Sequence, residues 1–259
     1  MLASLKWLTL LSLDAPLVAV VWQAMLAQTL GGVIHWHHRA LVFSSVWLGY
    51  AADRWFDSLL NPQAPSAQHR YMRRFAKPYV AVWSAVLLLS LALAWARLEP
   101  TEWTRGTALV AAALLYTTFA QKGRSLPAYG VIKGFLVAAL VSASAALFVK
   151  DVWSFNALSI HVLATTALLY ACNCLLIRSW EKRHSYAKPA NRFLIPITAL
   201  SAALGLILHP DQWSFGLSAL ASLLLLGFVH RFRSSFGPIA SRALADICLL
   251  APLPFLLVP

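Results

Sequence analysis

The chain has 259 residues, of which 60% are hydrophobic and only 12% are charged, and its mean hydropathy is +0.68. This composition excludes an ordinary water-soluble domain, whose surface needs more polar and charged side chains. The net charge of +12 would suggest nucleic acid as the partner of a soluble protein, but here the Lys and Arg residues collect in short loops between apolar runs. We therefore expect a lipid bilayer, and no nucleic acid, around this chain.

Apolar runs that are long enough to cross a bilayer recur along the whole chain. A helix needs about 20 residues to cross the hydrocarbon core, and the runs at 78–95 and 213–229 approach that length. This pattern predicts one all-α transmembrane domain over residues 1–259, with about nine helices. The first run is long and contains Asp14, so we expect a retained helix there instead of a signal peptide. The predicted spans are residues 7–31, 39–57, 78–97, 104–120, 128–149, 155–178, 193–209, 213–229 and 237–258.

The loops between these spans carry very unequal positive charge. Positive residues are retained on the cytoplasmic side of a membrane, so the asymmetry predicts a multi-pass protein of the cell (inner) membrane, with a cytoplasmic N-terminus and the C-terminus outside. The two longest loops, 58–77 and 179–192, are basic and fall on the cytoplasmic side, which makes that side the expected place of function. The opposite side receives only Arg39, Arg97, Arg105 and Lys150.

Two carboxylates, Asp53 and Asp57, lie at the end of the second predicted span. Their spacing of four places both on one face of a helix, about one turn apart. Two such oxygens can share a hard cation, and Mg²⁺ is often held by one or two carboxylates together with substrate phosphates. The alternative is that Asp53 pairs with Arg54 or another nearby base, while Asp57 is solvated at the helix end.

A second polar segment follows four spans later, at the end of the sixth predicted span. Asn173, Ile177 and Glu181 share one helix face there, at the spacing of Gly49, Asp53 and Asp57. Glu181 is a candidate metal ligand, and Asn173 a candidate substrate contact. The alternative for Glu181 is a surface position beside Lys182.

Basic residues surround both polar segments. Arg70 follows the first, Arg178 belongs to the second, and Lys122 follows Tyr116 at the end of the fourth predicted span. Clustered cations can neutralise a diphosphate and favour its departure. Anchoring to anionic lipid headgroups is the alternative for most of the basic residues in these loops.

Lys133, Arg242 and Asp246 are charged residues inside predicted spans, where charges are costly. Lys133 has no acidic neighbour in its own span, so we expect a partner elsewhere, either Asp14 or a bound anion. Arg242 and Asp246 have the spacing of an intrahelical pair. Asp14 itself precedes Pro16 and is expected to cap the first helix.

The remaining candidates have simpler interpretations. The run from His35 to His38 resembles a metal-binding tract, but it falls on the outer side, apart from the other polar groups and without an evident carboxylate partner. We therefore expect these histidines to be interfacial. Cys172 and Cys174 lie in an apolar run and are expected to be packing residues.

These features resemble the UbiA-type superfamily of intramembrane prenyltransferases. The segment from Leu13 to Pro16 is similar to the family's first helix, and Gly49 to Asp57 is similar to its first Asp-rich motif. The segment from Tyr116 to Arg124 resembles the tyrosine-and-lysine segment after its fourth helix. The sequence departs from the pattern in two places: Gly49 replaces the motif's asparagine, and the second Asp-rich motif is reduced to Asn173 with Glu181.

The resemblance implies a bundle of nine helices that transfers an isoprenyl group from a polyisoprenyl diphosphate to a hydrophobic, aromatic acceptor. Asp53 and Asp57 would hold Mg²⁺ and the diphosphate, with Tyr116 and Lys122 in the same catalytic pocket. The faces of Tyr116 and Tyr170 would stabilise an allylic cation. The candidate substrate-binding residues are Arg70, Asn173, Arg178, Glu181, Lys133 and Tyr170.

Two other classes of function stay open. The incomplete second motif is compatible with a non-catalytic relative that binds a lipid, quinone or pigment, or that supports assembly of a membrane complex. A small transporter that uses Lys133, Arg242 and Asp246 is less favoured, because the polar residues concentrate on one face of the membrane.

Overall fold

The computed structural model describes residues 7–60, 71, 74–122, 128–180 and 187–257. Every regular element within these ranges is a helix, and none of them contains a strand, as the composition predicts. Two short 3-10 helices, η2 (Lys150–Ser154) and η3 (Pro210–Gln212), connect α7 to α8 and α9 to α10. In chain order the α-helices are α2 (Asp14–Leu30), α3 (Trp36–Leu60), α5 (Ala76–Arg97), α6 (Pro100–Lys122), α7 (Tyr129–Ala146), α8 (Ala157–Ser179), α9 (Ala187–Leu208), α10 (Trp213–Phe236), α11 (Pro238–Cys248) and α12 (Leu253–Leu256).

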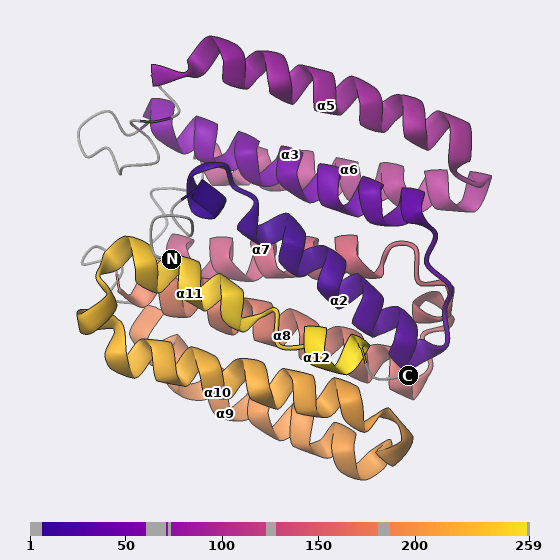
Figure 1. Cartoon of the computed structure of the whole chain (residues 1–259), viewed down its shortest axis with the longest axis vertical. Helices are drawn as coiled ribbons and strands as arrows, with labels where there is room; N and C mark the ends of the chain where they lie inside the picture. The colour runs from indigo at the N-terminus through magenta and orange to yellow at the C-terminus, as the bar shows by residue number, and fades with distance from the viewer. Residues whose placement is uncertain (1–6, 61–70, 72–73, 123–127, 181–186, 258–259) are drawn as a thin grey trace.

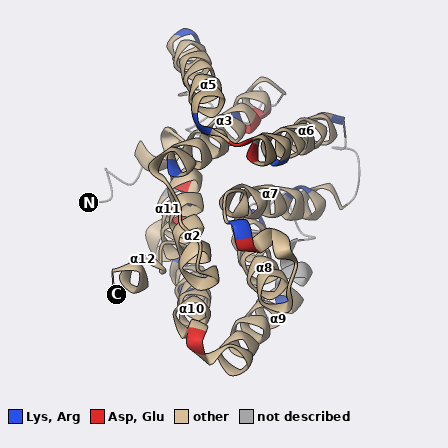
Figure 2. Cartoon of the chain, turned by 90° about the vertical axis from the view of Figure 1, so that its right-hand side faces the viewer, with Lys and Arg blue, Asp and Glu red and all other residues tan. Residues whose placement is uncertain are grey.

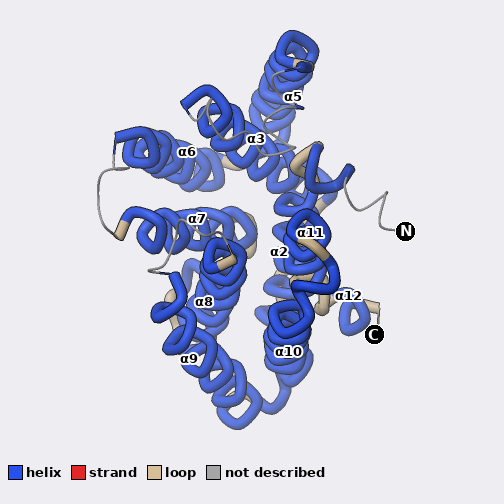
Figure 3. Tube along the Cα trace, turned by 90° about the vertical axis from the view of Figure 1, so that its left-hand side faces the viewer, coloured by secondary structure: helices blue, strands red, loops and turns tan. Residues whose placement is uncertain are grey.

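From α2 to α11, consecutive helices run in alternate directions between the two ends of the bundle, and α12 continues in the direction of α11 (Figure 1). The C-terminal ends of α3, α6, α8 and α10 lie at one end, which we call the site end because Asp53 and Asp57 are near it. Seen from the opposite end, most of the ribbon is tan and charged residues are sparse (Figure 2). Seen from the site end, α7 lies between α6 and α8, and α2 packs beside α10 and α11 (Figure 3).

Four helical segments within the described residues are long and apolar enough to cross a membrane. They are Ala76–Arg97, Tyr129–Ala146, Ala157–Ser179 and Pro210–Phe236, and a shorter apolar helix covers Arg192–Leu208. Such lengths match the thickness of the hydrocarbon core. The chain is therefore an all-helical protein with the features of a membrane protein.

Helix α5 shows what kind of solvent the bundle needs. It packs mainly against α3, at the edge of the molecule (Figure 1). The large apolar side chains of its free faces point outward, with Leu89 70% exposed and Trp95 82% exposed. Apolar surface of this extent would be unstable in water, whereas lipid tails solvate it without cost.

The first helix differs from the predicted span 7–31. Residues 7–10 are helical, but the chain turns at residues 11–13 and α2 begins only at Asp14. Ser12 has a φ of 58°, which interrupts the helix because an L-residue in this region cannot continue a right-handed helix. Asp14 is the first residue of α2 and not its N-cap, which is Leu13, so the predicted capping role is wrong. The Asp14 side chain instead accepts a hydrogen bond from the backbone N–H of the next residue, Ala15, at 3.0 Å.

The ninth predicted span, 237–258, is wrong as one continuous helix. It divides into α11 and the single turn α12, with a break over residues 249–252. Pro252 and Pro254 lack backbone N–H donors, which prevents continuous helical hydrogen bonding through this region. The Trp22 indole N–H donates to the Leu249 carbonyl at 2.7 Å, and this bond satisfies an acceptor beside the break.

Trp22 of α2 is the centre of the main core. Its side chain is fully buried and makes edge-to-face contacts with Tyr170 of α8, at 6.2 Å between ring centroids, and with Phe215 of α10, at 5.9 Å. Together with the bond to Leu249, these contacts join four segments that are distant in the sequence. Trp22 therefore fixes how α2 passes through the bundle.

We expect Trp22→Phe to lower the free energy of unfolding by about 1–3 kcal/mol, because the buried Leu249 carbonyl loses its donor. Thermal unfolding of the purified protein in detergent measures this change. Trp95→Phe is the matched control, since Trp95 is almost wholly exposed. Equal unfolding temperatures for the two variants would contradict the role given to Trp22.

Candidate functional site

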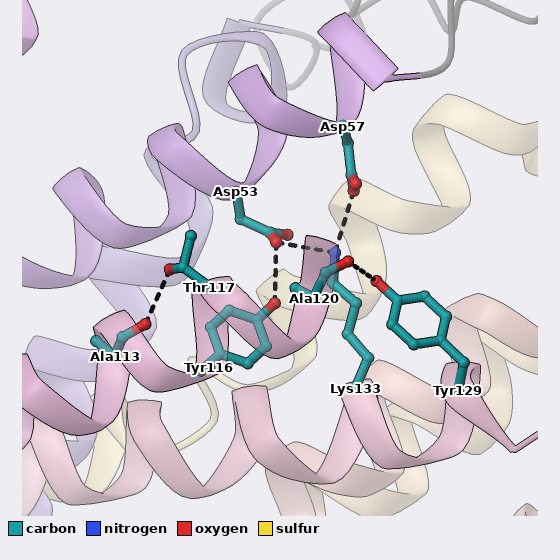
Figure 4. A network of polar contacts seen from close by, with 8 residues as sticks. All are labelled: Asp53, Asp57, Ala113, Tyr116, Thr117, Ala120, Tyr129 and Lys133. Carbon is teal, nitrogen blue, oxygen red and sulfur yellow. Dashed lines mark hydrogen bonds and ion pairs between the residues drawn. The ribbon is translucent and has the colours of Figure 1, made fainter. Parts of the chain in front are cut away.

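The predicted pair Asp53 and Asp57 lies on one face of α3 near its C-terminal end (Figure 4). We call these two residues the carboxylate pair. Their side chains are 21% and 32% exposed, respectively, so both are accessible from outside the helix packing. The one-face arrangement follows directly from the spacing of four on a regular helix.

The partner of the carboxylate pair is Lys133 of α7. Its ammonium Nζ lies 2.8 Å from Asp53 Oδ1 and 3.1 Å from Asp57 Oδ2, and its side chain is only 4% exposed (Figure 4). Lys133 therefore bridges both carboxylates, and its predicted pairing with Asp14 is wrong. Asp53 does pair with a base, as one interpretation of the sequence holds, but that base comes from a different helix.

Tyr116 of α6 completes this contact set. Its hydroxyl donates to Asp53 Oδ1 at 2.9 Å, and the side chain is 9% exposed. The Tyr129 hydroxyl at the start of α7 donates to the Ala120 carbonyl near the end of α6 at 2.7 Å (Figure 4). Three helices are thus connected by polar contacts at the site end.

A close approach between α7 and α8 determines the direction in which Lys133 points. Gly134 faces α8 so closely that a Cβ there would lie 2.8 Å from a methyl group of Leu175. Small residues commonly allow such approaches between membrane helices. Because Gly134 faces α8, the adjacent Lys133 is directed to another side of α7, where α3 and α6 provide its partners.

Asn173 has a different set of contacts from the carboxylate pair. Its amide N–H donates to Asp246 Oδ1 of α11 at 2.7 Å, and the Asp246 side chain is close enough to Asp14 of α2 for the two carboxyl groups to interact. We call Asp14, Asn173 and Asp246 the acid–amide cluster. Asn173 Oδ1 and Asp14 Oδ2 are buried and accept no hydrogen bond in the described structure. Asp246 thus has partners on α8 and α2, beyond the pairing with Arg242 that its own helix suggests.

Arg178 is a basic residue in the last turn of α8, at the site end. Its guanidinium is close enough to Tyr116 for its charge to act on that hydroxyl. Its charge also acts on Cys174 and Arg242.

The other predicted site residues lie at varied places. Tyr170 is buried deeper, edge-on to Trp22, and its hydroxyl has no hydrogen-bond partner in the described structure. Lys122 is the exposed last residue of α6. Arg70 and Glu181 lie outside the described residues.

The carboxylate pair has the donor chemistry of a magnesium site, with support from one observation. Both carboxylates already converge on a single cation, the Lys133 ammonium. Among the described residues, no three His, Cys, Asp or Glu side chains gather to hold a metal ion by themselves. Mg²⁺ at Asp53 and Asp57 would therefore depend on waters or phosphate oxygens for its other ligands, which is common for this ion.

Among the histidines at the opposite end, His38 was misjudged from the sequence as an interfacial residue without a carboxylate partner. His38 has a carboxylate partner, because its Nε2 lies 3.2 Å from Glu102 Oε1 of α6, and both side chains are 6% exposed. The His38 ring also stacks on Phe148, with 4.5 Å between ring centroids. His35 and His37 lie beside it. The sequence carries no local signal for this pair, because His38 and Glu102 belong to different helices.

Comparisons with known proteins give no relative from which the function of the site could be inferred. No family model, no curated protein and no solved structure matches the chain. The resemblance to UbiA-type prenyltransferases therefore rests on the sequence motifs alone.

We expect the buried His38 contact to make stability depend on pH. His38 precedes the predicted span 39–57, and burial lowers the pKa of its imidazole below 6.5 more strongly than the Glu102 carboxylate raises it. The unfolded chain then binds a proton more readily than the folded chain, so stability falls as the pH drops below about 6.5. Unfolding temperatures between pH 7.5 and 5.5 should decrease.

The control for this pH effect is a pair of histidine variants. His38→Gln should flatten the pH dependence, whereas His35→Gln, at an exposed position, should keep it. A slope that is unchanged in His38→Gln would show that another group is responsible.

Proposed function

We propose that this chain is a divergent UbiA-type prenyltransferase, with about nine membrane spans and its site end in the cytoplasm. It transfers an isoprenyl group from a polyisoprenyl diphosphate to a hydrophobic, aromatic acceptor within the bilayer. The observation that carries the proposal is the convergence of Asp53 and Asp57 on one cation. This pair lies where Tyr116 and Arg178 also gather.

The reaction needs positive charge near the diphosphate when the diphosphate leaves. The bond between the allylic carbon and the diphosphate oxygen breaks, and its electron pair leaves with the diphosphate. A new bond then forms between that carbon and the acceptor, which gives up one proton. Mg²⁺, when bound, supplies positive charge to the leaving diphosphate.

The residues of the chain have separate roles in this proposal. Asp53 and Asp57 hold the metal, and Tyr116 orients Asp53 through its hydrogen bond. Arg70, Arg178, Lys122 and Lys133 provide positive charge to the diphosphate, and Glu181 is a further ligand of the metal. The face of Tyr170 contributes to stabilising the developing allylic cation.

A non-catalytic binding function has one observation in its favour. Asn173, the remnant of the second motif, donates to Asp246, which lies outside the carboxylate pair. A relative of this kind would bind an isoprenoid, quinone or pigment without turnover.

The decisive measurement is prenyl transfer by purified protein in lipid nanodiscs, with and without Mg²⁺. The assay offers polyisoprenyl diphosphates of several chain lengths and a lipophilic phenol, and it detects products by mass. We expect Mg²⁺-dependent product. Asp53→Asn combined with Asp57→Asn should lower the rate by about a hundredfold or more, the usual effect of losing charge stabilisation in a transition state.

Asp211→Asn is the matched control, because Asp211 is an exposed carboxylate at the opposite end of the bundle. Its rate should equal that of the wild type. Tight diphosphate binding without product would favour the binding function. Transfer that is undiminished in the double variant would rule out the roles given to the carboxylate pair.

A further inference from the structure

Lys133 occupies the position that a cation bound by Asp53 and Asp57 would need. One ammonium nitrogen is within 3.1 Å of an oxygen from each carboxylate, and the lysine is almost fully buried. We propose that Lys133 is a resident counter-ion that competes with a divalent cation for the carboxylate pair. The chemistry of the ligand, a metal complex of a diphosphate, rests on the proposed function, but the competition itself does not.

Geometry makes the two cations mutually exclusive. The oxygens of Asp53 and Asp57 that contact Lys133 converge on one point, so they are directed toward the space that the ammonium fills. A magnesium ion needs its carboxylate oxygens at about 2.0–2.1 Å, closer than the lysine nitrogen is now. It can bind both carboxylates only if the ammonium withdraws.

Charge leads to the same conclusion. The pair carries two formal negative charges, and Lys133 compensates one of them. A divalent ion added beside the ammonium would place three positive charges against two negative ones in a partly buried site, where Coulomb repulsion is strong. Conversely, removal of Lys133 leaves two carboxylates one turn apart that repel each other until another cation arrives.

The withdrawn ammonium needs a new anionic partner. Lys133 has a flexible stem of four carbons, and its three N–H donors suit phosphate oxygens. A diphosphate that arrives together with the metal provides such a partner at the same place. Metal and diphosphate should therefore bind more tightly together than separately, and Lys133 is the group that couples them.

The test is binding of Mn²⁺, as a paramagnetic substitute for Mg²⁺, to purified protein in nanodiscs of uncharged lipid, measured by electron paramagnetic resonance. Lys133→Met keeps an unbranched side chain of similar length without the charge. We expect it to bind Mn²⁺ about tenfold to a hundredfold more tightly than the wild type, the range that loss of a competing charge-assisted contact gives. Lys77→Met, an exposed lysine at the start of α5, should change the affinity by less than about twofold.

Inorganic diphosphate tests the coupling. It should raise Mn²⁺ affinity in the wild type to a greater extent than in Lys133→Met. Only the wild type has an ammonium that can move from the carboxylate pair to the diphosphate. Adding Asp53→Asn and Asp57→Asn to Lys133→Met should abolish the tighter Mn²⁺ binding of that variant. This result would locate the ion at the carboxylate pair.

Thermal unfolding keeps the proposal testable if Lys133→Met folds poorly. That variant should be less stable than the wild type without metal and should recover with Mn²⁺, while the wild type changes little. Three results would each contradict competition between Lys133 and the metal. They are equal or weaker Mn²⁺ binding by Lys133→Met, no Mn²⁺ binding by either protein, and instability of Lys133→Met that Mn²⁺ does not relieve. Failure of prenyl transfer with this binding pattern intact would instead refute only the proposed function.

Discussion

The bridge from Lys133 to Asp53 and Asp57 is the constraint on which the site end depends. An ammonium on a helix that is long and apolar enough to cross a membrane is costly unless it finds an opposite charge. Lys133 finds two, and both are on α3. This requirement fixes the rotation of α7 and its depth relative to α3. Tyr116 then connects α6 to the same point, so the contact that compensates one buried charge also determines how three helices meet.

The helices that the sequence predicted best are those with long, uninterrupted apolar runs. α5, α7 and α8 begin and end close to their predicted bounds, because such runs are sufficient to specify a membrane helix locally. α10 begins at its predicted first residue but continues to Phe236, beyond the predicted end at 229. The two ends of the chain were predicted less well. The turn at Ser12 has no signal in the local sequence. The break before α12 contains two prolines, but the bond from Trp22 to Leu249 beside it joins residues that are 227 apart in the chain.

The site shows the same division between local and distant information. The common face of Asp53 and Asp57 follows from their spacing, so the sequence alone was sufficient to predict it. The identity of their partner was not, because Lys133 is 76 residues from Asp57 and has no acidic neighbour in its own helix. The pairs Asn173 with Asp246 and His38 with Glu102 were missed for the same reason, since each joins different helices.

Charge compensation also limits which ligands the site end can accept. A bare divalent ion would release the Lys133 ammonium into a region of low dielectric without a counter-ion, and a bare diphosphate would meet the negative charge of Asp53 and Asp57. A complex of a divalent cation with a diphosphate avoids both costs. Its cation replaces Lys133 at the carboxylate pair, and its anion becomes the new partner of the Lys133 ammonium. The buried lysine therefore makes the carboxylate pair selective for a complex over its components, which a pair of solvated carboxylates with the same spacing would not be.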